Sequence, residues 1–336
     1  MTQSKHHPKS HSSQQGLTLV ELLVAMAISA VIALAAISAL IVSRQGFTTV
    51  DAASQLRDNG RFATDLLQRL GVQTGFLEID TAATVRPADL TANPASKVFG
   101  FNNSIASSTD PLNSSTARTG ATSLGFGSDI LILRYQTTAA FRGALTSDRS
   151  MIDCFGFSRS VLPVNRDDFQ VNVVHVAVDN TGEPSLMCTT DSDTSAAFNS
   201  QPIIRGVENF QVLYGVDGVA AGTSVTASAT FLATNYLRAD QMAVSPDPTG
   251  ALTNANWRRV RSIRIGMVIR GAIGSAQESA ARTFFPFGTA LSASGGTAGS
   301  AMSSTNDAGT IFTPAADSRL RQVVTLTIHL RNETGL

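Results

Sequence analysis

The chain has 336 residues with 25 basic and 25 acidic side chains, so its formal net charge is zero. This balance argues against a nucleic-acid-binding protein, which usually presents a basic surface, and a hydrophobic content of 43% excludes a chain that is disordered throughout. Two cysteines and five histidines leave little material for metal or nucleophile chemistry, and we predict no cofactor and no metal site. Composition favours a structural or envelope protein over an enzyme.

The N-terminus reads as a membrane anchor. Residues 1–16 are polar and basic without an acidic side chain, and an apolar segment follows from Leu17 to Val42. The stretch from Leu22 to Val42 carries no charge and would span about 31 Å as a helix, close to the thickness of a bilayer's hydrocarbon core. The basic leader is expected to stay in the cytoplasm while the C-terminal bulk is exported.

Two simpler interpretations of this segment compete. A cleaved secretory signal has a shorter apolar core with a small-residue cleavage site after it, whereas Ala25-Met26-Ala27 lies inside the run. An ordinary signal anchor fits the length but leaves Glu21 unexplained, unless its carboxylate reaches back to the membrane interface.

The segment from Gly16 to Ala25, with the sequence GLTLVELLVA, resembles the class III signal of type IV pilins and pseudopilins. The resemblance implies that a prepilin peptidase cuts after Gly16 and methylates the new N-terminus at Leu17, a position that is usually Phe in the family. It also implies that Glu21 neutralises a terminal amine when helices pack into a filament, because a buried charge needs a partner.

The helix is predicted to continue beyond Val42. Apolar residues recur at helical spacing, so residues 43–71 are expected to form an amphipathic second half, with Gly71 as the expected stop. These residues are Leu56, Ala63, Leu66, Leu67 and Leu70. A helix over residues 17–70 would be about 81 Å long. We expect four parts: a leader (1–16), a transmembrane and filament-core segment (17–42), the amphipathic half (43–71) and a periplasmic β-rich head (72–336).

Strands are predicted in the head where β-branched residues cluster or alternate with polar ones. They cover residues 129–135, 171–178, 207–216, 263–269 and 324–330. Because no amphipathic helices separate them, we expect an antiparallel sheet and an α+β, type IV pilin-like fold with the long helix packed on the sheet. The Ser/Thr/Ala/Gly-rich segments 88–123, 217–233 and 288–318 are interpreted as loops or disordered insertions.

A narrower resemblance lies in the second half. The stretch from Val212 to Asp217, VLYGVD, followed by Trp257 and a strand with Ile263-Arg264-Ile265, is similar to the PilW family of minor pilins. The resemblance implies a priming or tip-complex subunit of a type IV pilus, placed in the inner membrane and then on the pilus. Its implied partners are other minor pilins, the major pilin, prepilin peptidase, the inner-membrane assembly platform and a tip adhesin. In many relatives the segment after this motif suggests a calcium loop, but residues 218–222 hold no carboxylate here.

Two alternatives remain open for the function. A pseudopilin of a type II secretion system, of the GspJ kind, would share the signal and a similar head. A membrane-anchored envelope enzyme would need a catalytic group, and His175 and His329 are the histidines outside the leader. Both lie at alternating strand positions, where packing or surface roles are commoner, and no G-x-S-x-G, H-E-x-x-H or P-loop motif occurs.

Cys154 and Cys188 both lie in the exported part, where a pair of cysteines is usually a disulfide. The PilW resemblance implies the same bond, and a free thiol pair or a metal site are the alternatives. The basic cluster Arg258, Arg259, Arg261 and Arg264 could meet DNA or an acidic partner, but a charged strand end is the preferred interpretation.

Overall fold

The structure, a computed structural model, describes residues 16–79, 95–120, 123–192, 195–276, 280–288 and 304–332. The chain divides into two compact units, residues 1–50 and residues 51–336. One helix, α1 (Leu19–Gln73), contributes its first residues to one unit and its last residues to the other.

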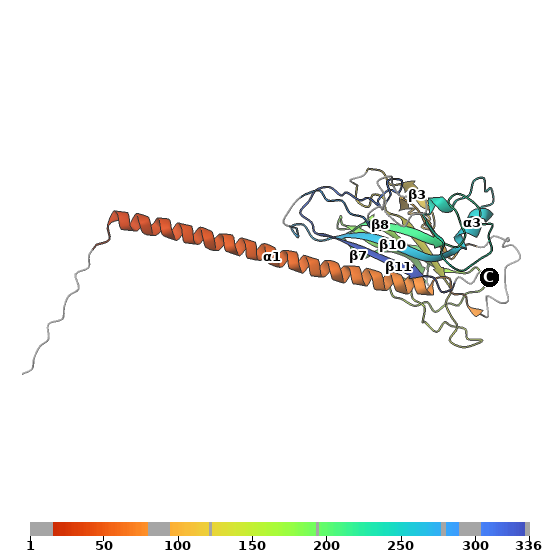
Figure 1. Cartoon of the computed structure of the whole chain (residues 1–336). Helices are drawn as coiled ribbons and strands as arrows, with labels where there is room; N and C mark the ends of the chain where they lie inside the picture. Colours follow the sequence, from red (N-terminus) through yellow and green to blue (C-terminus); the bar gives the residue numbers. More distant parts are fainter. Residues whose placement is uncertain are drawn as a thin grey trace, which may run out of the picture. The chain divides into compact units, whose positions relative to one another are not determined.

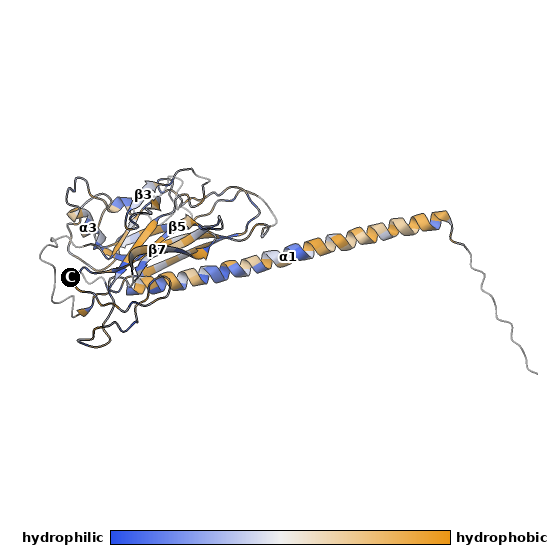
Figure 2. Cartoon of the chain, turned by 180° about the vertical axis from the view of Figure 1, so that it is seen from behind, coloured by the Kyte–Doolittle hydropathy of each residue, from blue (hydrophilic) through white to orange (hydrophobic). Residues whose placement is uncertain are grey.

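The first unit consists of the apolar part of α1. Figure 2 shows this part as almost continuously hydrophobic, whereas the later turns of the helix alternate between polar and apolar residues. Among the described residues, α1 is the one helix that is long and apolar enough to cross a membrane. All of its large apolar side chains up to Val50 are exposed, as expected for a segment whose partner is lipid or another chain.

The second half of α1 packs on the sheet of the head through a stripe at helical spacing. The buried positions are Ala52, Leu56, Gly60, Ala63, Leu67, Leu70 and Gly71. The two glycines permit close approach: a Cβ at Gly60 would lie 3.0 Å from Val324, and one at Gly71 would lie 2.6 Å from Ile328.

The predicted stop at Gly71 is wrong, because the helix runs on to Gln73. The Thr74 hydroxyl donates a 2.7 Å hydrogen bond to the Leu70 carbonyl, and Gly75 then takes a left-handed conformation with φ +80°. Gly75 is therefore the glycine that ends the helix, whereas Gly71 serves helix–sheet packing.

The head contains two main antiparallel sheets (Figure 1). The first has the order β1-β4-β5-β6-β7. Its strands are β1 (Val98–Phe101), β4 (Ile130–Tyr135), β5 (Gln170–Val178), β6 (Pro184–Ser192) and β7 (Ser195–Arg205).

The second sheet has the order β11-β10-β8-β9. Its strands are β8 (Val207–Val216), β9 (Asn235–Leu237), β10 (Val260–Arg270) and β11 (Arg321–His329). β8 is buried along its whole length. Phe210 and Tyr214 on this strand and Trp257 join the helix stripe in one hydrophobic core. Smaller elements are the β2–β3 pair (Ser104–Ala106 and Ser114–Ala117), the 3-10 turn η1 (Asp240–Met242) and α3 (Ala251–Trp257).

The α+β prediction is confirmed, with five of the strands close to their expected places and two sheets rather than one. The expectation that residues 88–123 form loops is wrong where the structure describes them, because β1, β2 and β3 lie there. Residues 217–233 form turns without a strand, as predicted. Residues 289–303 lie outside the described residues, and 304–318 form turns with one bridge, Phe284 to Phe312.

Candidate functional site

The backbone around the expected cleavage position precedes the helix. Gly16, Leu17 and Thr18 are not helical, and α1 begins at Leu19. Leu17 is 78% exposed, and a Cβ built on Gly16 would meet no atom within 4 Å. An exposed, non-helical peptide bond is the form in which a protease can bind its substrate backbone, because the backbone groups are not engaged in helical hydrogen bonds.

Glu21 forms a reciprocal capping box with Thr18. The Thr18 backbone N–H and hydroxyl each donate to Glu21 Oε2 at 2.9 Å, and the Glu21 N–H donates to Thr18 Oγ1 at 3.3 Å. This arrangement satisfies N–H groups that the first turn of a helix leaves without partners. It also holds the Glu21 carboxylate at the start of the helix, beside Thr18, the residue that follows Leu17. This contact was not among the sequence predictions, although the T-x-x-E spacing of residues 18–21 indicates it.

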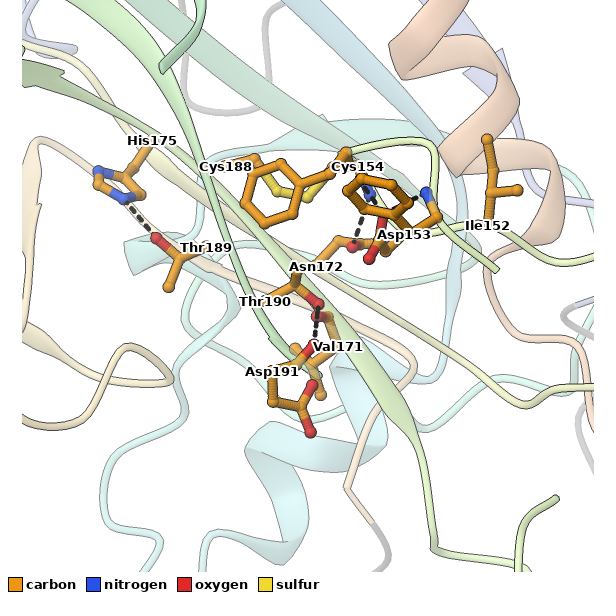
Figure 3. The surroundings of a disulfide bond; sticks show 12 residues. Ile152, Asp153, Cys154, Val171, Asn172, His175, Cys188, Thr189, Thr190 and Asp191 are labelled. Carbon is orange, nitrogen blue, oxygen red and sulfur yellow. Dashed lines mark hydrogen bonds between the residues drawn. A yellow bond between two sulfur atoms is a disulfide. The ribbon is translucent and has the colours of Figure 1, made fainter. Parts of the chain in front are cut away.

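Cys154 and Cys188 are joined by a disulfide with a Cα–Cα distance of 6.2 Å (Figure 3). Both cysteines are buried, and Cys188 lies on β6 while Cys154 lies in the long connection before β5. The Cys154 N–H donates to the Asn172 side-chain oxygen on β5 at 3.1 Å. The bond therefore fixes the middle of an irregular segment to the first sheet.

The same segment is tied to the end of α1. The Gln73 amide accepts a 3.3 Å bond from the Ile152 N–H and donates to the Ile152 carbonyl. This pair of bonds, two residues before Cys154, links the helix, the connection and the sheet. Neither Gln73 nor Ile152 carries a sequence signal that predicts it.

His175 has a packing role. It is buried on β5, and its Nε2 lies 3.0 Å from the Thr189 hydroxyl (Figure 3). Burial and the nearby charge of Arg118 lower the pKa of His175 to about 4, so the ring is neutral at physiological pH. The other histidine, His329, lies exposed at the end of β11, so the structure does not bring the two together.

The basic cluster serves the head's own structure. Arg259 and Arg261 each lie 3.7 Å from the Asp217 carboxylate, and Arg261 also covers the Phe231 ring at 5.1 Å. Arg264 lies over the ring of Phe287. These contacts fit the interpretation of a charged strand end better than a nucleic-acid surface.

Asp217, the last residue of the VLYGVD motif, organises the loop that follows it. It is buried and accepts bonds from the N–H groups of Thr230 and Phe231 and from the Thr230 hydroxyl at 2.7–2.8 Å. Burial raises the pKa of Asp217, but these hydrogen bonds and the charge of Arg261 outweigh it and hold the pKa below its usual range. Within the described part of the chain, no group of three His, Cys, Asp or Glu side chains could hold a metal ion.

A buried ion network at the edge of the head was not anticipated. Arg270 donates to Glu183 and to Glu208, each at 2.8 Å. Arg321 pairs with Glu208 and Asp317, both at 2.6 Å. Because these residues lie far apart in sequence, no local motif predicts the network. It joins the β5–β6 turn, β8, β10 and the start of β11.

Comparisons with known proteins find matches both to the N-terminal segment and to the head. A family described as the prokaryotic N-terminal methylation motif matches residues 11–37, and the family described as Type IV Pilus-assembly protein W matches residues 173–332. The chain is a PilW-like minor type IV pilin. Its PilW match contains β8 and β10 with the VLYGVD motif and Trp257, and its methylation motif contains Gly16 and the apolar start of α1.

Other comparisons add less. No curated protein matches this pilin. Among solved structures, a type IV-like pilin from Thermus thermophilus superimposes with a TM-score of 0.35 at 12% identity, covering 82% of this chain and 97% of the other. The PilW family is a structural family, and the apolar start of α1 makes this member a membrane-anchored pilin.

Proposed function

We propose that this minor pilin primes or caps a type IV pilus by packing with other minor pilins. The observation that carries the proposal is the combination of one continuous helix, α1, with a head of two sheets and long connections. A large head at every position would crowd a helical filament, whereas a subunit present once at the tip meets neighbours on fewer sides. The match to a pilus-assembly family favours a pilus over a type II secretion system.

The steps before assembly follow from the N-terminal residues. In this proposal, residues 1–16 stay in the cytoplasm, prepilin peptidase cuts after Gly16 and methylates Leu17, and the head folds and is oxidised in the periplasm. Residues 17–42 first cross the inner membrane and later enter the filament core. Support comes from the exposed non-helical backbone at Gly16 and Leu17 and from the disulfide in the head.

Glu21 is proposed to neutralise a terminal amine during assembly. The capping box keeps the Glu21 carboxylate beside Thr18 at the helix start. Cleavage would form the Leu17 amine one residue along the chain from the Thr18 hydroxyl that binds this carboxylate. A carboxylate among apolar side chains is costly without a positive partner. Proposed partners are the neighbouring minor pilins, the major pilin, the assembly platform and a tip adhesin.

The proposal is tested by quantifying the protein in purified pili. We expect it at far below the abundance of the major pilin, and we expect Glu21→Gln to reduce piliation while Asp51→Asn, an exposed carboxylate later on α1, leaves it unchanged. Stoichiometric abundance along the pilus would overturn the tip or priming role. Normal piliation with Glu21→Gln would overturn the role of the carboxylate.

A further inference from the structure

Two buried carboxyl groups from distant parts of the chain meet in the head. Asp129, just before β4, is 3% exposed, and Asp307, in the turn of residues 304–312, is 7% exposed. The Asn102 side chain lies between them. With its NH2 group turned toward the carboxyls, the Asn102 nitrogen lies 3.1 Å from Asp129 Oδ1 and 3.3 Å from Asp307 Oδ1.

The surroundings of Asp129 suit the ionised form. Its oxygens accept the N–H groups of Asn103 at 2.8 Å and Val212 at 2.7 Å, and the guanidinium of Arg118 is close. Tyr214 and Arg238 also face Asp129. Burial and the neighbouring charge of Asp307 nevertheless raise the pKa of Asp129, because two negative charges in one dry site repel each other.

The surroundings of Asp307 suit the protonated form. Its nearest cation, Arg238, lies 3.8 Å away, and Arg238 is already held by Asp240 at 2.8 Å. Burial raises the pKa of Asp307 to about 7, against the opposing charge of Arg238, and the negative charge of Asp240 adds to the increase.

The turn that carries Asp307 is also held by its own hydrogen bonds and by contacts with neighbouring segments. Asp307 is the one charged side chain in residues 304–312, and the Thr310 hydroxyl closes the turn on the Ser304 and Asp307 carbonyls. Gly309, at φ +90°, packs so tightly on Gly127 that a Cβ built on Gly127 would lie 2.4 Å from the Gly309 Cα. The Phe284 to Phe312 bridge fixes the other end.

We propose that Asp307 carries a proton while Asp129 stays ionised, with the Asn102 NH2 group donating to both, and that this proton makes the turn of residues 304–312 a latch that holds in acid and loosens as the pH rises. Loss of this proton leaves two carboxylates in a buried site with Asp240 nearby, where Arg118 faces Asp129 and the Arg238 guanidinium lies 3.8 Å from Asp307. Release of the turn moves Asp307 into water, where its charge is solvated.

The direction follows from proton linkage. Asp307 binds its proton more tightly in the closed turn than in the open one, so the extra stability is complete below the ordinary aspartate pKa of about 4. It is lost progressively as the pH rises to about 7. Opening is therefore expected to become on the order of 50-fold more favourable between about pH 5 and about pH 7.5.

The test is hydrogen exchange of peptides covering residues 304–312 in the full chain in detergent, corrected for the intrinsic effect of pH on exchange. We expect protection to fall in the wild type between about pH 5 and about pH 7.5. Asp307→Asn keeps the shape and removes the titration, so its protection should be the same at both values. Asp110→Asn, an exposed carboxyl in another turn, should behave as the wild type.

Either of two results would overturn the latch. One is a wild-type turn whose corrected protection does not change with pH, a comparison that needs no variant. The other is an Asp307→Asn protein that loses protection with pH as the wild type does, which would assign the effect to another group.

Discussion

Gly71 shows how one residue can be misread from sequence and then explained by packing. A glycine after a run of helical positions usually marks the end of a helix, but here a Cβ would lie 2.6 Å from the Ile328 side chain. Position 71 has no room for a side chain, because α1 and β11 approach each other closely there.

This gives a prediction about Gly71→Ala. The added methyl group must displace Ile328, so we expect a loss of about 1–3 kcal/mol in the free energy of unfolding. Gly46→Ala is the matched control, since nothing lies within 4 Å of its Cβ and alanine favours the helix by about 1 kcal/mol. Denaturant unfolding of both variants in detergent measures the difference. Equal stability of the two variants would contradict the close approach of Gly71 and Ile328.

At the scale of elements, the sequence predicts strands that combine burial with β-branched residues. The predicted strands that correspond to β5, β8 and β10 begin and end within a few residues of the observed bounds. β6 and β7 were not expected, because one is rich in Ser and Thr and the other contains Pro202. Their pairing depends on partners and on a bulge near Pro202, which local propensity does not encode.

The disulfide is the element-scale feature whose removal should matter most. It closes a loop with a sequence separation of 34, for which the chain-entropy model gives up to about 4 kcal/mol. We expect the Cys154→Ser/Cys188→Ser protein to lose about 2–4 kcal/mol of unfolding free energy, measured against the oxidised wild type. The irregular segment before β5 should become the first region cut by a protease. Unchanged stability and unchanged cleavage would contradict this role.

At the scale of the whole molecule, the ion network and the two sheets could not be read from local patterns. Arg270, Glu183 and Glu208 meet because the β5–β6 turn, β8 and β10 converge at one edge of the head. The N-terminal motif depends on residues close together in the chain, so the sequence predicts cleavage and anchoring there, whereas the Thr18–Glu21 cap was not predicted although its spacing is local.

The network gives a prediction about Arg270→Ala. Removing this guanidinium costs two charge-assisted hydrogen bonds but leaves Glu183 paired with Arg319 and Glu208 paired with Arg321, so we expect a loss of about 1.5–3 kcal/mol in the free energy of unfolding. Arg205→Ala is the control, because the Arg205 side chain is 63% exposed and its buried partner Asp179 keeps hydrogen bonds from Thr181 and Ser185, so we expect a loss of about 0–1 kcal/mol. Unfolding of both variants in the same denaturant decides the matter. A cost for Arg270→Ala no larger than that of the control would show that the network is incidental.

The most direct test of the account as a whole is the intact mass of this pilin from cells with and without prepilin peptidase. The account predicts that the mature chain lacks residues 1–16 and carries one methyl group at Leu17, with the full-length chain accumulating when the peptidase is absent. A chain that stays uncut in both strains, or one cut after the apolar segment that ends at Val42, would contradict it.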